Sequence, residues 1–457
     1  MSKPQSAQNI VSKSWSEHFI QTAKLAGPVM VARAGILVLI AVDTAMTGHA
    51  STAELAAYAV ASAPLVPMLL LGVGLLSGTT VFIAHAVASG SPEEAGRIWR
   101  VSQAFALVFG LLMFAVCLAG ESLLLLLGQT DDLARQGGRV LAWMGLGLPG
   151  ALMFATSSFA IESLGRPSMG VVIMALANLL NIGLNWLLIY GNAGFPQMGA
   201  EGAALATSLA RWFSAVALIA YVYRCVDRTK FGISGKIPNP MATFGRLFRF
   251  GLPMGIAHTL ESSAFATMVI FAGWMGTTVI AAYQAAFNLI AIPFMVALGF
   301  TTAASVYVAA ALGAASSRDA VRATVSASVL CILALSIVSI ALMATPATFA
   351  SIYTDDSELL ALCIPAVVMA GLVVVPDGLQ ATLMGALRGF RDVWPATGLY
   401  LLSFWGVMVP AGYMFGVTGH GGPTELLVAT LLGVTFACGL FALRFCAVSR
   451  TWTPAIP

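Results

Sequence analysis

The chain has 457 residues, of which 59% are hydrophobic and 9% charged, with a formal net charge of +3 and a mean hydropathy of +0.91. A soluble protein would carry roughly a quarter charged residues, so the composition excludes that class and predicts a polytopic membrane protein surrounded by the lipid bilayer. The net charge is too small to indicate a nucleic-acid partner.

Apolar runs divided at Gly, Pro and charged clusters predict twelve helices, many longer than the roughly 20 residues that cross a bilayer. The predicted ranges are 17–48, 52–89, 96–127, 135–165, 168–191, 198–225, 243–275, 277–313, 319–351, 357–388, 394–416 and 424–448. The polar N-terminus lacks the apolar core of a signal peptide, so the first helix is expected to be a retained span. The expected fold class is an all-α polytopic membrane protein.

The second half of the chain repeats the first at a constant offset, since Pro28 aligns with Pro253 and Gly74 with Gly299 (253 − 28 = 299 − 74 = 225). A duplicated block of membrane helices is typical of secondary transporters, whose two halves move around a shared site. Each half holds six predicted helices, so the repeats are parallel. The predicted domains are an N-terminal segment, an N-lobe, a linker, a C-lobe and a C-terminal tail over 1–16, 17–225, 226–242, 243–448 and 449–457.

The basic residues predict the orientation of the helices. Of the 22 Lys and Arg residues, the N-terminus, the even-numbered loops, the linker and the C-terminal region hold all but Arg33, Arg135, Arg139 and Arg211. By the positive-inside rule both termini and the linker are cytoplasmic. The acidic pairs Asp131–Asp132 and Asp355–Asp356 then face outward.

Three acidic residues lie well inside predicted helices: Asp43, Glu261 and Asp377. A carboxylate in hydrocarbon costs about 2.5–3.5 kcal/mol even on lenient membrane-insertion scales. Each acid therefore indicates either a functional site or a structural acid that is paired with an arginine or lies close enough to the interface to stay hydrated. At about 1.5 Å per residue, Glu261 and Asp377 lie roughly 18 Å and 16 Å from the cytoplasmic edge, as measured from Arg249 and Arg388. Two carboxylates at one depth predict a proton or cation site.

Asp43 lies nineteen residues after Lys24, roughly 28 Å from the cytoplasmic edge, and Asn185 reaches the same level (43 − 24 = 185 − 166 = 19). Asn178, Asn181 and Asn185 are spaced three and four residues apart, which aligns them on one helix face. Such amides either join helices by hydrogen bonds or act as ligands beside the acid. Both interpretations stay open at this point.

Arg33 lies ten residues before Asp43, too far along the helix for a direct pair. It either extends its charge toward the cytoplasm or pairs with another acid such as Glu162.

Three prolines are candidate helix-bending residues, because proline removes a backbone hydrogen bond. Pro28 and Pro253 are equivalent in the repeat, and Pro376 directly precedes Asp377. The six cysteines show no CxxC or CxxH spacing, so neither a disulfide framework nor a metal cluster is expected, and no cofactor is predicted.

Five segments, in order and in repeat register, resemble the multidrug and toxic compound extrusion (MATE) transporters, particularly the NorM-type bacterial branch. They are VDTAMTG at Val42–Gly48, NIGLNWLLIYG at Asn181–Gly191, RFGLPMGIAHTLES at Arg249–Ser262, AAYQAAFN at Ala281–Asn288 and PDGLQATLMGALRGFRD at Pro376–Asp392. The resemblance implies twelve helices in two six-helix lobes. It also implies a functional monomer of the inner membrane that exports organic cations in exchange for H⁺ or Na⁺.

The resemblance also implies the site residues. It assigns Asp43, Asn181 and Asn185 to one cation site, and a second cluster to Glu261, Gln284, Asn288 and Asp377. Sodium exporters of this branch carry Tyr four residues before the acid of the tenth helix, where this chain has Val373. That departure favours protons, with Na⁺ at Asp43 or at Glu261 and Asp377 as the alternative.

Other functions are weaker. A flippase for lipid-linked sugars, from the same wider superfamily, often has fourteen helices and a cationic cavity, which three buried acids do not favour. A channel needs no coupled acid. No P-loop, HExxH or nucleophile–base arrangement indicates an enzyme.

Overall fold

The computed structural model describes residues 14–234, 237–354 and 356–452, and within these ranges every regular element is helical. Twelve described helical stretches are long and apolar enough to cross a membrane. The expected all-α, twelve-helix membrane class is therefore confirmed. Asp355, residues 1–13 of the predicted N-terminal segment and the end of the tail lie outside the described residues.

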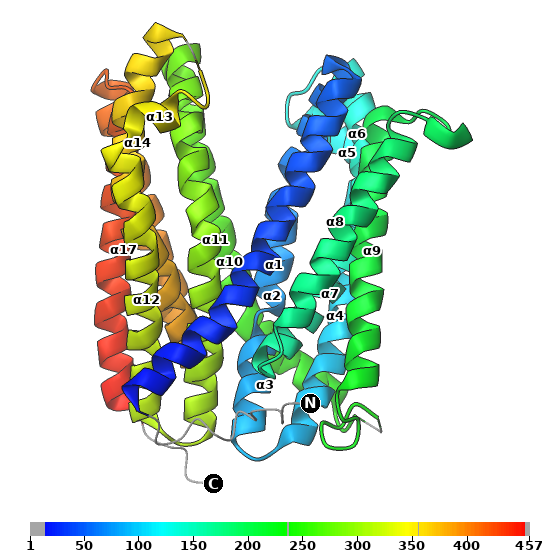
Figure 1. Ribbon diagram of the computed structural model, residues 1–457, viewed down its shortest axis with the longest axis vertical. Coiled ribbons are helices and arrows are strands. Elements are labelled where there is room, and N and C mark those ends of the chain that lie inside the picture. Colours follow the sequence, from blue (N-terminus) through cyan, green and yellow to red (C-terminus); the bar gives the residue numbers. More distant parts are fainter. Residues whose placement is uncertain (1–13, 235–236, 355, 453–457) are drawn as a thin grey trace. The chain divides into compact units, whose positions relative to one another are not determined.

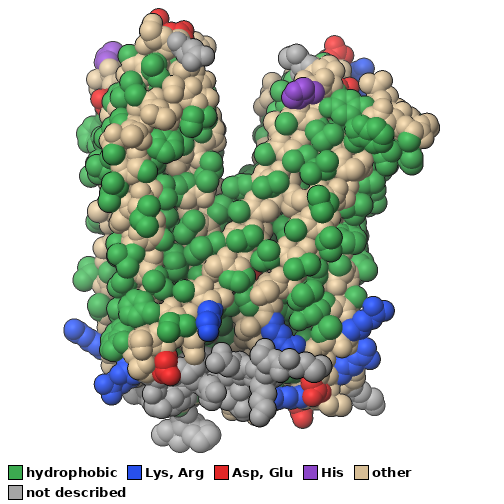
Figure 2. Space-filling model, viewed as in Figure 1, with side chains coloured by type: hydrophobic (Ala, Val, Ile, Leu, Met, Phe, Trp, Pro, Cys, Tyr) green, Lys and Arg blue, Asp and Glu red, His purple; other side chains and the backbone are tan. Residues whose placement is uncertain are grey.

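The chain forms two compact units (Figure 1). Unit 1 is Val31–Gly255, and the described part of unit 2 is residues 14–30 and 256–452. In Figure 2 the sides of the helices in each unit carry mostly hydrophobic side chains, and charged side chains gather near the helix ends. This distribution suits helices that are surrounded by lipid along their length and by water at their ends.

Unit 1 contains most of the helices of the first repeat. They are α1 (Trp15–Ala50, from Val31 onward), α2 (Thr52–Leu76), α3 (Gly78–Ala88), α4 (Pro92–Leu118), α5 (Gly120–Leu126), α6 (Asp131–Gly145), α7 (Leu148–Ser163), α8 (Ser168–Leu188), η2 (Asn192–Gly194), α9 (Gly199–Cys225) and α10 (Pro240–Met275, as far as Gly255).

Unit 2 contains the corresponding helices of the second repeat. They are the start of α1, the rest of α10, α11 (Thr277–Gly313), α12 (Ser317–Ala344), α13 (Pro346–Ala350), α14 (Ser357–Gly389), α15 (Val393–Tyr400), the π-helix η3 (Leu401–Met408), α16 (Val409–Gly412), the π-helix η4 (Tyr413–Thr418) and α17 (Pro423–Thr451).

The observed spans follow the predicted ranges closely, and two of them end seven or more residues before the predicted end. The predicted helix 96–127 ends at Leu118 and continues as α5, and the predicted helix 319–351 ends at Ala344 before α13. Glycine and proline explain both breaks: Gly120 starts α5, and Pro346, which has no amide hydrogen to donate, starts α13.

The helices α1 and α10 are each shared between the two units. In unit 1, the start of α10 packs on the first repeat: Phe250 makes an edge contact with Phe82, with ring centroids 5.3 Å apart, and Arg246 forms an ion pair with Glu94 at 3.0 Å. In unit 2, the start of α1 packs on the second repeat, where His18 lies 3.4 Å from Asp319. Each first helix of a repeat therefore begins on the body of the other repeat.

Small residues allow these crossings. A Cβ on Gly74 would lie 2.5 Å from the Cα of Gly255, so the two backbones touch. Gly299 and Met30 are the equivalents of this pair at the repeat offset, and a Cβ on Gly299 would lie 2.4 Å from the Cγ of Met30. Only glycine fits at Gly74, because the neighbouring atoms belong to backbone.

The span formed by α6 and α7 is interrupted at residues 146 and 147. Side chains of α9 satisfy the backbone there: the hydroxyl of Ser208 donates to the carbonyl of Trp143 at 2.6 Å, and the indole of Trp212 donates to that of Leu146 at 2.9 Å. A break in a membrane helix is tolerated when neighbouring side chains take up its free backbone groups.

Candidate functional site

Unit 1 buries Asp43 at the centre of a network of neutral hydrogen-bond donors. Asn181 and Asn185 of α8 donate to its Oδ1 at 3.0 Å and 2.7 Å. Tyr58 of α2 donates to Oδ2 at 3.0 Å, and the hydroxyl of Thr207 of α9 donates to the same oxygen. Asp43 is 0% exposed. Each carboxylate oxygen thus accepts two hydrogen bonds, which is the usual way that a protein holds a buried carboxylate.

The sequence placed Asp43, Asn181 and Asn185 at one site, and the structure brings these three together. Tyr58 and Thr207 were missed. They lie on two other helices, and a single hydroxyl in an apolar helix gives no periodic signal. Asn178, the third amide on the same face, does not reach Asp43: it donates to the carbonyls of Gly35 at 3.1 Å and of Met174 at 2.9 Å.

A second buried charge cluster of unit 1 is the pair of Arg33 and Glu162. The Nη2 of Arg33 lies 3.4 Å from Oε1 of Glu162, and the two side chains are 16% and 5% exposed. The guanidinium also lies over the ring of Phe159, 5.6 Å from its centroid. Of the two alternatives for Arg33, the structure therefore shows the pair with Glu162. The Oε2 of Glu162 is buried and has no hydrogen-bond partner among the described residues.

Unit 2 brings Glu261 of α10 and Asp377 of α14 to one amide. Gln380 donates its Nε2 to Oε1 of Glu261 at 3.1 Å and to Oδ1 of Asp377 at 3.4 Å. His258 lies one turn before Glu261, with its Nδ1 3.7 Å from Oε2. Tyr400 is buried and interacts electrostatically with Glu261. Since two like charges so placed oppose each other, this pair suits a bound proton or cation.

Comparison with known proteins identifies the family. The MatE family profile matches residues 28–187 and 253–414, one segment in each repeat. A probable multidrug resistance protein NorM from Caulobacter vibrioides is 34% identical over 429 residues, which cover 93% of this chain and 91% of that protein. The multidrug resistance protein PmpM of Pseudomonas aeruginosa is 31% identical over 93% of this chain and 91% of its own length.

This chain belongs to the MATE family of multidrug efflux transporters. The fold agrees with this assignment: a solved outward-facing MATE transporter of the MOP superfamily superposes with a TM-score of 0.88 at 18% identity, covering 98% of this chain and 100% of that one. The eukaryotic MATE transporter AtDTX14 gives a TM-score of 0.86 at 18% identity, covering 95% and 98%. The chain is therefore a transporter rather than an enzyme.

Two residues to which the MATE resemblance pointed are not part of the acid cluster of unit 2. Gln284 and Asn288 are exposed on α11, and neither makes a side-chain hydrogen bond to another described residue. In their place Gln380 contacts both acids, as the spacing of one turn from Asp377 could have indicated. Val373 is fully buried.

The three candidate helix-bending prolines all lie inside helices, Pro28 in α1, Pro253 in α10 and Pro376 in α14. Each leaves a backbone carbonyl one turn earlier without its usual donor. For Pro376 this carbonyl is that of Leu372, five residues before Asp377 in the sequence.

Among the described residues, no group of three or more His, Cys, Asp or Glu side chains is placed to hold a metal ion. Around Asp43 the hydrogen-bonding partners are amides and hydroxyls, whereas the second cluster also has the imidazole of His258. A sodium ion would have to be bound there by one or two carboxylates with amide and hydroxyl oxygens, such as the Oδ1 of Asn185 and the Oε1 of Gln380, which are buried without a hydrogen-bond partner.

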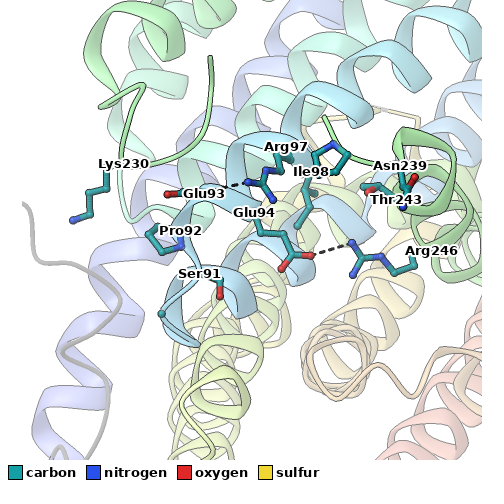
Figure 3. A pocket seen from close by; sticks show the side chains of 12 residues that line it. Ser91, Pro92, Glu93, Glu94, Arg97, Ile98, Lys230, Asn239, Thr243 and Arg246 are labelled. Carbon is teal, nitrogen blue, oxygen red and sulfur yellow. Dashed lines mark hydrogen bonds and ion pairs between the residues drawn. The ribbon is translucent and has the colours of Figure 1, made fainter. Parts of the chain in front are cut away.

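Unit 1 also has a pocket of about 800 Å³ between the α3–α4 loop, the first turns of α4, the start of α10 and the linker residues Lys230, Pro238 and Asn239 (Figure 3). None of its lining residues belongs to an acid cluster of this MATE chain. Its two acids are already neutralised, Glu93 by Arg97 at 3.3 Å and Glu94 by Arg246 at 3.0 Å. Because no negative charge is left over, the pocket is a poor site for an organic cation.

Proposed function

We propose that this MATE transporter is a secondary antiporter that exports organic cations in exchange for protons, and that the two cations compete for Asp43. One observation carries the proposal: Asp43 is fully buried, and every hydrogen bond that it accepts comes from a neutral side chain. A single negative charge in an apolar surrounding can balance one cation but not two. Proton binding therefore lowers the affinity for the drug, and proton release restores it.

The proton is proposed over sodium for two reasons. The carboxylate oxygens of Asp43 already accept four hydrogen bonds, and a proton disturbs this arrangement less than a sodium ion that must coordinate several oxygens. At the second cluster, buried Val373 offers no oxygen beside Glu261 and Asp377. We propose that this cluster binds a second proton or cation during the cycle.

The chain is proposed to work as a monomer in the inner membrane of a bacterium, with both termini on the cytoplasmic side. The distribution of basic residues supports this orientation. The identity to bacterial NorM and PmpM proteins supports the type of membrane.

The test uses purified protein in proteoliposomes loaded with a fluorescent organic cation. A proton gradient alone should drive transport of the dye, and a sodium gradient alone should not. Transport driven by sodium alone would assign sodium as the coupling ion. Transport driven by neither gradient would contradict secondary antiport altogether.

A further inference from the structure

A positively charged side chain lies one helical turn from the Asp43 site. Thr207 of α9 donates to Asp43, and Arg211 follows it by four residues, so both side chains lie on the same face of α9. Arg211 interacts electrostatically with Tyr58 and with Asp43. It does not donate to Asp43, whose four donors are all neutral. Its Nη1 is buried and has no hydrogen-bond partner among the described residues.

The break between α6 and α7 holds this guanidinium in place. Ser208 and Trp212, on either side along α9, bond to backbone carbonyls of the break. The side chain of Arg211 passes over Gly147, where an added Cβ would lie 3.0 Å from its Cδ. The position of the charge is therefore fixed by packing against backbone and not by an acidic partner.

A purely structural role explains this arrangement poorly. A structural arginine in a membrane helix is expected to pair with an acid or to reach the interface. Arg33 of the same unit follows that pattern with Glu162. Arg211 forms no ion pair within 4.0 Å with another described residue; the residue is half-buried, and its Nη1 is inaccessible to solvent. A charge kept in such a position is expected to act on the acid with which it interacts electrostatically, which is Asp43.

We propose that Arg211 is a positioning residue that lowers the affinity of Asp43 for cations, so that a bound cation can be released. This inference rests on the proposed function and deepens it. When the site is empty, the guanidinium stabilises the Asp43 carboxylate. When a proton or an organic cation is bound, the carboxylate is neutralised and the guanidinium repels the bound cation. An opposite charge within about 4–6 Å disfavours the neutral form of a carboxylate by tenfold or more, and this is the effect that we assign to Arg211.

The test measures equilibrium binding of tetraphenylphosphonium to the purified full-length protein at alkaline pH, where protons compete least. Arg211→Met should lower the Kd about tenfold or more and should slow dye release in proteoliposomes. Arg211→Gln, which is also neutral but keeps hydrogen-bonding groups, should do the same, and Arg211→Lys should stay near the parent value. Arg139→Met, which removes an exposed arginine of the same unit, is the matched control and should leave the Kd unchanged.

The decisive comparison repeats Arg211→Met and Arg211→Gln in an Asp43→Asn background, where the gain in affinity should disappear. A folded Arg211→Met or Arg211→Gln protein with an unchanged Kd would overturn the proposal, and so would a gain that persists without the Asp43 charge. Failure of the proposed function is distinguishable, because it would abolish gradient-driven transport in the parent protein while leaving the binding comparison measurable.

Discussion

Gly74 of α2 and Gly255 of α10 touch through their backbones within unit 1, since a Cβ on Gly74 would lie 2.5 Å from the Cα of Gly255. Because backbone atoms cannot rotate away, Gly74→Ala should lower the stability of the protein by about 1–3 kcal/mol. Thermal unfolding in detergent would measure this loss. Gly183→Ala on α8 is the matched control: nothing lies within 4 Å of its added Cβ, so it should be neutral or slightly stabilising. Equal behaviour of the two variants would contradict the close contact.

Asp43→Asn should abolish gradient-driven efflux of a cationic dye while leaving the protein folded in the membrane. Asparagine imitates the protonated acid in shape but can neither release a proton nor offer a negative charge to a bound cation. Loss of a buried charge rarely costs stability when its partners are neutral. Asp132→Asn is the control: it changes an exposed acid near the start of α6, and this variant should transport normally. Near-normal efflux by Asp43→Asn would move the coupling site to Glu261 and Asp377.

Glu261→Gln and Asp377→Asn should each impair transport, and the double variant should be little worse than either alone. The reason is that Gln380 bridges both carboxylates, at 3.1 Å and 3.4 Å, so the three side chains act as one site. Gln380→Leu should show a defect of the same kind. Efflux rates under a proton gradient provide the measurement, and fully additive losses would show two independent sites.

Glu162→Gln should destabilise unit 1 by about 3–5 kcal/mol, because it leaves the charge of Arg33 buried without its partner. Adding Arg33→Met should recover much of that loss. The pair of Arg139 and Glu201 is the control: it has the same separation of 3.4 Å, but its side chains are 63% and 28% exposed. Because Glu201 also accepts a hydrogen bond from Trp143, the control variant is Arg139→Met, which should cost about 1 kcal/mol or less. Thermal unfolding of the single and double variants decides the matter, and equal costs for both pairs would contradict a buried ion pair.

The orientation can be tested by labelling with a membrane-impermeant thiol reagent in intact cells. In a background without the exposed Cys225 and Cys446, Asp132→Cys should react and Thr229→Cys should react only after the cells are opened. Asp132 lies in the first turn of α6 on the predicted outer side, and Thr229 lies in the predicted cytoplasmic linker. Reaction of Thr229→Cys in intact cells would reverse the topology.

The sequence predicted the helices and part of the first site because both depend on local spacing. Hydropathy sets the length of a span, and counting residues from a basic helix end placed Asp43 and Asn185 at one depth. The donors Tyr58 and Thr207 could not be predicted in this way, since they reach Asp43 from separate helices whose rotation is decided by packing. For the same reason the spacing of Asn178 left two interpretations open, a ligand or a hydrogen bond between helices, and its amide donates to backbone carbonyls of Gly35 and Met174.

For the second site, the cluster of Glu261 and Asp377, residue spacing and family resemblance differ in what they predicted. The matching depths of Glu261 and Asp377 agree with their shared contact to Gln380, but the sequence analysis did not single out Gln380, which lies one turn after Asp377. Gln284 and Asn288 came from family resemblance alone, and their exposed positions in unit 2 depend on which face α11 turns inward. A resemblance to a family predicts which residue type stands at a position, but it does not predict whether the helix turns that side chain toward the site.

The exchange of helix starts between the units bears on how such a chain could have arisen. A polypeptide with a single repeat would have a first helix whose beginning had no body of its own to pack on. Two copies could each pack the start of their first helix on the body of the other copy, as in a domain-swapped dimer. Joining the two copies end to end would keep every one of those contacts and convert an association that depends on concentration into a permanent one. Such a fusion would leave behind a parallel repeat like the one in this chain.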